Sequence, residues 1–192
     1  MTRYRPTDYV RLYEETLAKL ETDSDDRALQ HQAVLALARA GATDFAQAEY
    51  ERYGLDQCHD DEDIMALAAR LEKDRFLTAS GDKKTKHANK SAGLYQAAFE
   101  KTGGFYSGIN SATMSFISAQ DAVRASIDAD TILRLLPETE ALSPENLYFI
   151  EATRAEGHLL RGDLKRAKAS LQRAIRHDPL NYPAHSTTLK QF

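Results

Sequence analysis

The residues of this 192-residue chain that could do catalytic or metal chemistry are six histidines, one cysteine and a glycine- and lysine-containing segment. No two histidines have the HExxH or a similar spacing that puts two ligands on one metal. Cys58, His59 and Asp60 are sequence neighbours, which does not place a nucleophile opposite a base, so we interpret them as an exposed turn. Gly81 to Thr85 lacks the preceding strand and the glycine spacing of a phosphate loop. We therefore predict no catalytic residue, no metal, no cofactor and no enzymatic activity. The six histidines are His31, His59, His87, His158, His177 and His185.

Composition predicts a helical protein of the cytoplasm. Twenty-five basic and 29 acidic residues give a formal charge of −4, which argues against nucleic acid as a partner. The single cysteine excludes an intrachain disulfide and any multi-cysteine zinc site. No apolar run approaches the ~20 residues that a membrane span needs, and the charged N-terminus does not have the pattern of a signal peptide. We expect neither a membrane nor a nucleic acid to be the partner.

Alanine- and leucine-rich segments with helical periodicity recur along the chain and are separated by regular breaks. The breaks fall at Gly41, Gly81, Gln120-Asp121 and Gly162, about 40 residues apart, which is the period of helix-pair repeats. Such repeats stack so that each pair buries its apolar face on its neighbours. The sequence therefore predicts an all-α superhelix, a tetratricopeptide-like repeat solenoid. We expect one domain over residues 1–192, with an N-terminal helix at 7–21, about four helix pairs within 26–178, and a tail or the start of a further element at 179–192.

Local signals set the expected helix ends. Thr7 is a candidate cap for the first helix, and the acidic runs at 21–26 and 60–63 stand where carboxylates complement helix N-termini. The lysine-rich segment 81–91 has no apolar period and is predicted to be an extended turn. After Gly103 and Gly104, Ser107 is expected to cap the next helix.

The last helix pair has the pattern of a tetratricopeptide repeat. With Gly162 at its turn, small or apolar residues fall where the two helices cross, and a proline follows the second helix (Ala155, Ala167, Leu171, Ala174 and Pro179). Three positions depart from this pattern because they hold polar residues where large apolar ones are usual (Glu151, Arg154 and His158). We interpret this end of the chain as a cap or as a surface covered by something else.

Three successive segments, 70–76, 94–100 and 106–113, carry a resemblance to a known family. Their sequences, RLEKDRF, LYQAAFE and YSGINSAT, resemble motifs of the TRAF-binding, tetratricopeptide-containing central regulatory domain of apoptosis signal-regulating MAP kinase kinase kinases and its bacterial homologues. The resemblance covers about residues 27 to 178. It implies an α-solenoid that contacts proteins or peptides and restrains or arranges a signalling effector, either separate or in the same polypeptide. It does not imply TRAF binding.

Five polar residues in these motifs are candidates for contact with a partner in the concave groove: Arg70, Lys73, Asp74, Ser107 and Asn110. Arg70 and Asp74 are four residues apart and could form an ordinary helix ion pair, or with Lys73 they could hold a partner's charged group. Asn110 could bond locally to the backbone or project to a partner. For the Arg70–Asp74 pair and for Asn110, the local contact and the contact with a partner both stay open.

The last helix carries a basic face, for which Arg161, Lys165, Arg166 and Arg173 are the binding candidates, with Lys168 and Arg176 beside them. Such a face either serves solubility or attracts phosphate or an acidic partner. The sequence thus favours a non-catalytic protein-interaction and regulatory scaffold. The alternative is a sensor that closes its concave groove around a peptide or small ligand. The oligomeric state stays open.

Overall fold

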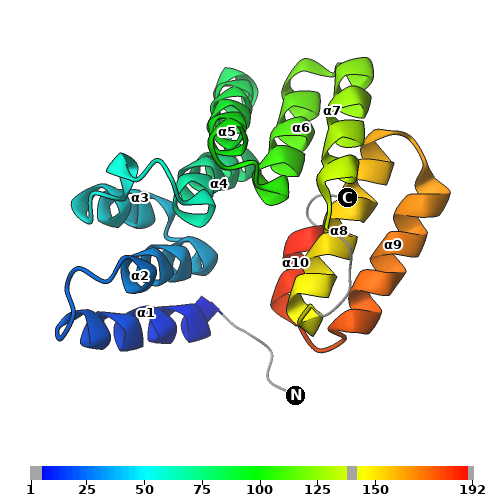
Figure 1. Ribbon diagram of the computed structural model, residues 1–192. Coiled ribbons are helices and arrows are strands. Elements are labelled where there is room, and N and C mark those ends of the chain that lie inside the picture. Colours follow the sequence, from blue (N-terminus) through cyan, green and yellow to red (C-terminus); the bar gives the residue numbers. More distant parts are fainter. Residues whose placement is uncertain (1–5, 138–141, 190–192) are drawn as a thin grey trace. The chain divides into compact units, whose positions relative to one another are not determined.

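Regular runs of good helix formers, interrupted by capping residues, give this chain an all-helical structure. The computed structural model describes residues 6–137 and 142–189, which form ten α-helices, one short 3₁₀ helix and no β-strand (Figure 1). The predicted fold class, a tetratricopeptide-like α-α repeat fold, is confirmed. The chain divides into two compact units, Met1–Gly103 and Gly104–Phe192, each described here by itself.

Unit 1 consists of consecutive helices that pack on their neighbours in the chain. The helices are α1 (Pro6–Leu20), α2 (Arg27–Ala40), α3 (Thr43–Arg52), α4 (Glu62–Thr78) and α5 (Gly81–Thr102), with the 3₁₀ helix η1 (Leu55–Gln57) between α3 and α4. α1 packs on α2, α2 on α3 and α4, and α4 on α5 (Figure 1). The sequence order of the helices is therefore also their packing order.

The core of unit 1 lies among α2, α3, η1 and α4. Buried aliphatic residues from these elements meet the ring of Tyr50, whose hydroxyl donates to the carbonyl of Ile64 at 3.1 Å. This bond satisfies the one polar atom of a side chain that is otherwise valuable for its apolar area. The buried members are Val34, Leu37, Ala38, Ala46, Tyr50, Leu55, Ile64, Leu67 and Leu71.

Unit 2 contains α6 (Phe105–Ala119), α7 (Ala122–Leu135), α8 (Pro144–Leu160), α9 (Leu164–His177) and α10 (Tyr182–Leu189). α8 packs on α9, α7 and α6. Tyr148 of α8 is fully buried and donates to the hydroxyl of Thr188 in α10 at 2.8 Å, so α10 is tied to α8. α10 occupies the expected tail, of which residues 190–192 lie outside the described residues, as do 1–5 and 138–141 of the expected domain.

The four predicted breaks are confirmed, and each separates the two helices of one pair. Gly41, Gly81 and Gly162 have positive φ angles, and Gln120 adopts the left-handed conformation at the end of α6. The pairs are α2 with α3, α4 with α5, α6 with α7, and α8 with α9, and in each the two helices pack together. The acidic runs also cap helices as expected, since Asp26 accepts from the first backbone N–H groups of α2 and Asp61 from that of Ile64 in α4.

Three local predictions are wrong. α1 begins at Pro6 and ends at Leu20, so Thr7 lies inside its first turn and not at the cap. Segment 81–91 is the first half of α5, because polar contacts to α4 replace the apolar period that the sequence lacks. α6 begins at Phe105 after Gly104, which places Ser107 inside the helix and not at its cap.

Candidate functional site

Three of the five predicted groove residues lie together on α4 of unit 1. Nε of Arg70 is 3.6 Å from Oδ2 of Asp74, an ion pair too long to be a hydrogen bond, and both side chains are about one-fifth exposed. The Nε atom of Arg70 is buried and makes no hydrogen bond within the described residues. Lys73, on the same helix, is half-buried. α4 thus holds a guanidinium with donor capacity left over.

The other two predicted groove residues lie on α6 of unit 2, and both are buried. Ser107 is fully buried, and Asn110 is 2% exposed. The amide nitrogen of Asn110 donates to the backbone carbonyl of Tyr106, one turn earlier, at 2.9 Å. This is the local backbone bond that asparagine makes inside a helix. The structure therefore brings Arg70, Lys73 and Asp74 together, and Ser107 and Asn110 together, as two separate sets.

A buried carboxylate, Glu72, lies on α4 two residues after Arg70 and escaped the sequence analysis. Glu72 is 3% exposed and is contacted by Arg75 at 2.9 Å, by Nδ1 of His87 at 2.7 Å and by Nζ of Lys90 at 2.9 Å. Arg75 also reaches Asp44 of α3 at 3.1 Å. The cluster links α3, α4 and α5.

The environment of Glu72 changes the acidity of its carboxyl group. Burial by itself raises the pKa of Glu72, but the hydrogen bonds from His87 and Lys90 and the charges of Lys90 and Arg75 outweigh it. The pKa therefore lies below its ordinary value. Glu72 is a structural anion, because all its contacts come from the helices it holds together.

Unit 2 has a similar cluster around Glu151 of α8, which is also 3% exposed. Arg154, one turn along α8, and Arg173 of α9 both pair with its carboxylate, Arg173 at 3.0 Å. Arg173 donates in addition to the hydroxyl of Ser170 at 2.8 Å. Two of the polar residues that depart from the repeat pattern, Glu151 and Arg154, thus form an ion cluster where apolar packing is usual.

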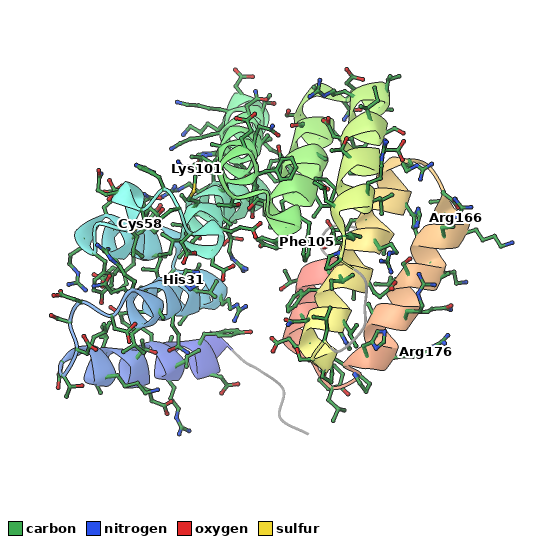
Figure 2. The ribbon with its side chains drawn as sticks, in the orientation of Figure 1. His31, Cys58, Lys101, Phe105, Arg166 and Arg176 are labelled. Carbon is green, nitrogen blue, oxygen red and sulfur yellow. The ribbon has the colours of Figure 1, made fainter. Side chains whose placement is uncertain are left out.

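The predicted basic face is largely engaged within unit 2. Arg161 pairs with Asp130 at 3.0 Å, Arg166 with Asp163 at 3.5 Å, and Arg173 with Glu151. Lys165 makes no ion pair within the described residues and is exposed. Arg166 and Arg176 project from α9 (Figure 2). Lys165 is therefore the one member of the four candidates that keeps its charge for another molecule.

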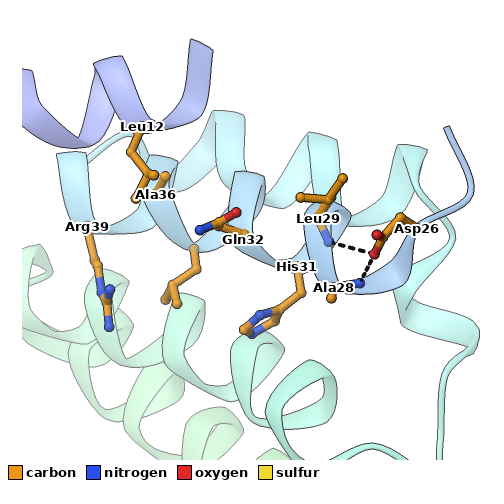
Figure 3. Close-up of a pocket in the computed structure, with 9 residues that line it drawn as sticks. Leu12, Asp26, Ala28, Leu29, His31, Gln32, Ala36 and Arg39 are labelled. Atoms are coloured by element: carbon orange, nitrogen blue, oxygen red, sulfur yellow. Dashed lines mark hydrogen bonds between the residues drawn. The ribbon is translucent and has the colours of Figure 1, made fainter. Parts of the chain in front are cut away.

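A cavity of about 400 Å³ lies against α2 in unit 1 (Figure 3). Leu12 of α1 lines it together with residues of α2 and its cap, and none of the predicted groove residues does. Burial lowers the pKa of His31 below its ordinary value, although the carboxylates of Asp63 and Asp61 act in the opposite direction. His31 is therefore a neutral ring in this wall. The lining residues are Leu12, Asp26, Ala28, Leu29, His31, Gln32, Leu35, Ala36 and Arg39.

A family model described as Tetratricopeptide Repeats-Sensor matches residues 7–115, which is more than half of the chain. The chain belongs to this family. No curated protein and no solved structure matches it. The match runs from α1 into α6 and includes all five predicted groove residues, whereas the basic face of α9 lies beyond it. Tetratricopeptide repeats generally mediate protein–protein interactions, and sensor repeats of this kind indicate a role in protein interaction or sensing.

The metal-binding residue types of the Tetratricopeptide Repeats-Sensor chain are scattered over its described part, residues 6–137 and 142–189. No group of three or more His, Cys, Asp or Glu side chains within this part could hold a metal ion. Cys58 is a half-buried free thiol beside exposed His59. Gly81 to Thr85 form the first turn of α5 and not a phosphate loop. None of the described helices is long and apolar enough to cross a membrane.

Proposed function

We propose that this chain is a non-catalytic regulatory scaffold of the cytoplasm that binds a protein or peptide and arranges or restrains a signalling effector. Repeated helix pairs provide extended surfaces for such binding, and membership of the sensor family supports a role in recognition. The resemblance of segments 70–76, 94–100 and 106–113 to the central regulatory domain of the apoptosis signal-regulating kinases supports an effector that is regulated by binding. The effector is either a separate protein or part of the same polypeptide.

The observation that carries this proposal is the state of Arg70. A buried guanidinium nitrogen without a hydrogen bond is costly, because it has lost water and gained no acceptor. Its ion pair with Asp74, at 3.6 Å from Nε, is too long for a hydrogen bond, so this nitrogen donates to no acceptor within the described residues. An acidic side chain or C-terminus of a partner would pair with the part of the guanidinium that is exposed, since the Arg70 side chain is about one-fifth exposed. Lys73, on the neighbouring side of α4, would add a second positive charge.

Affinity purification with the full chain, followed by identification and purification of the retained protein, tests this proposal. We expect Arg70→Gln to weaken binding of that protein about 10-fold or more, as removal of a desolvated charge contact does, with little change in Tm. Arg124→Gln is the matched control, because Arg124 forms an i,i+4 pair with Asp128 on α7 at 3.0 Å. A binding constant that is the same for wild type and Arg70→Gln would contradict the role of Arg70.

The second candidate is a small-ligand sensor, and the cavity on α2 is the observation that favours it. A volume of about 400 Å³ is within the range of small-molecule sites. Arg39 at its wall supplies a positive charge. A panel of small carboxylates and phosphates, screened by thermal shift, would raise the Tm of wild type but not of Arg39→Gln. If no compound changes the Tm of wild type, the sensor function loses this support.

A further inference from the structure

The outer side of α9 carries a narrow apolar stripe. Leu164, Lys168, Leu171 and Ile175 are spaced by four, seven and eleven positions, which places them on one side of the helix. Leu164 is 67% and Ile175 41% exposed, Lys168 is exposed, and Leu171 is half-buried between them. The side of α9 that unit 2 covers is formed by Ala167, Ser170 and Ala174. A second helix lying along the stripe would bury two aliphatic side chains that water now contacts.

α9 also carries three exposed cations, one of which, Lys168, belongs to the stripe. Lys165, Lys168 and Arg176 are exposed and form no ion pair within the described part of the chain, whereas Arg161, Arg166 and Arg173 do. A helix that covers the stripe must therefore bring acidic residues to meet them. An anionic membrane is a poorer match, because the stripe carries no Trp or Phe side chain.

α1 at the other end of the chain has the complementary pattern. Val10, Glu14, Leu17 and Glu21 follow the same spacing of four, seven and eleven positions. Val10 is 45% exposed, Leu17 is half-buried, and the two glutamates are exposed with no ion pair within the described residues. A neighbouring side of α1, with buried Thr16 and Leu20, packs on α2.

We propose that α1 of one copy of this chain packs along α9 of a second copy, with the two helices parallel. In this register Val10 lies against Leu164, and Leu17 against Leu171. Glu14 meets Lys168, and Glu21, just beyond the end of α1, is within reach of Arg176. The first three positions thus match, apolar against apolar and Glu14 against Lys168, while the fourth places Glu21 against Ile175, one residue before Arg176. The contact is independent of any partner of Arg70, because it uses neither that residue nor its helix.

The contact joins two different surfaces, α1 of one copy and α9 of another, and this determines which kind of oligomer forms. When α1 of one copy is occupied, its α9 stays available for a third copy. Contacts of this head-to-tail kind produce a ring when the rotation closes and an open filament when it does not.

Sedimentation velocity of the full chain, over concentrations from micromolar to millimolar, tests the proposal. We expect the sedimentation coefficient to increase with concentration at low salt beyond that of a dimer. The increase should be reduced in about 1 M salt, where the Debye length is about 3 Å. A wild-type chain that stays monomeric at every concentration would overturn the proposal and leave α9 to a different acidic protein or to an anionic surface.

Charge reversal gives the more specific result. Glu14→Lys and Lys168→Glu each place like charges across the contact, so each variant alone should be monomeric. An equimolar mixture of the two should assemble again, because each contact between unlike variants restores an opposite-charge pair. The double variant Glu14→Lys with Lys168→Glu should also assemble. Assembly of either single variant at the wild-type concentration contradicts the proposed register.

Two further variants control the experiment. Lys86→Glu makes the same charge change at an exposed lysine of α5 and should assemble as wild type does. Leu164→Ser removes an apolar member of the stripe without changing charge and should also yield monomers, which keeps the test valid if a charge reversal impairs folding. Circular dichroism of every variant establishes that the helices are intact.

Discussion

Glu72 in unit 1 and Glu151 in unit 2 are buried to the same degree, yet the side chains that contact them differ in kind and in number. Each glutamate lies on the first helix of its pair, and each pairs with an arginine one turn further along that helix, Arg75 or Arg154. From the second helix of each helix pair, His87 and Lys90 of α5 contact Glu72, whereas one arginine, Arg173 of α9, contacts Glu151. Glu72 therefore has three side-chain partners and Glu151 has two.

The second helices of these pairs, α5 and α9, also differ in how many apolar residues they bury in addition to the ionic contacts. The first half of α5, from Gly81 to Lys90, buries only Ala88, so its contacts with Glu72 replace apolar packing. α9 buries Ala167, Ser170 and Ala174 along its length in addition to its ionic contact. The comparison indicates that a buried ion cluster can substitute for a missing apolar period in one helix and can supplement an existing one in another.

Arg173→Ala in unit 2 should have the largest effect on stability. Its loss leaves the buried carboxylate of Glu151 with Arg154 alone and takes a hydrogen bond from the buried hydroxyl of Ser170. Breaking a buried pair costs several kcal/mol, and since the side chain of Arg173 is 44% exposed we expect about 2–3 kcal/mol of unfolding free energy. Urea denaturation, with hydrogen exchange of α8 and α9 to locate the loss, measures it.

Lys90→Ala is the matched variant of unit 1. Glu72 keeps Arg75 and His87 when Lys90 is removed, and the lysine side chain is 60% exposed, so the loss should be about 0.5 kcal/mol or less. Equal losses for Arg173→Ala and Lys90→Ala would show that the number of partners does not matter, and the comparison would fail.

Glu72→Gln should have an intermediate effect, and it should depend on pH. The charged hydrogen bonds that it weakens correspond to about 1–2 kcal/mol at neutral pH. Because the folded pKa of Glu72 lies below its ordinary value of 4.5, the unfolded chain binds more protons near that pH and stability rises with pH there. The stabilisation is complete above pH 4.5 and is lost as the pH falls through the folded pKa. Urea titrations of both proteins from neutral to acid pH measure this difference.

The location of the loss distinguishes the two units further. In Glu72→Gln, hydrogen exchange should accelerate mainly between Gly81 and Lys90, because little apolar burial remains there. Glu151→Gln is the control, and its α9 should stay protected by Ala167 and Ala174. Uniform loss of protection across unit 1 in Glu72→Gln would contradict a local role for the cluster.

The sequence predicts well what depends on backbone chemistry and poorly what depends on long-range polar contacts. Gly41 and Gly162 mark turns because a positive φ favours glycine, and Asp26 marks a helix start because its carboxylate accepts backbone N–H groups. Segment 81–91 lacks an apolar period. Its own sequence contains no signal that Glu72, many positions earlier, contacts it and stabilises it as a helix.

In the candidate site, too, local contacts are predictable from the sequence and packing between helices is not. The spacing of Arg70 and Asp74 predicts their contact, which the structure contains. The burial of Ser107 depends on a helix start three residues earlier than its capping chemistry suggests, since Gly104 is the cap. The sequence gives no reason to single out Gly157. In the structure, a Cβ atom at this position would lie 2.9 Å from the side chain of Leu133, so α7 and α8 approach closely at this glycine. Such approaches are set by packing between helices, which one segment does not encode.

Lys84→Ala should have a small effect, similar to that of Lys90→Ala, and tests whether α5 has a second polar attachment. Nζ of Lys84 lies 5.0 Å from the centre of the Phe76 ring on α4, a cation–π contact that contributes about 0.5 kcal/mol at exposed sites. Lys83, its neighbour in the first turn, is equally a cation at a helix N-terminus, where positive charge is unfavourable, but it makes no such ring contact within the described residues. Lys83→Ala should therefore leave stability unchanged or raise it slightly, and Lys84→Ala should be less stable than Lys83→Ala by about 0.5 kcal/mol. Urea denaturation of the two variants side by side measures the difference. Identical midpoints would leave the Glu72 cluster as the main polar attachment of the first half of α5, and the contrast with α9 would become sharper.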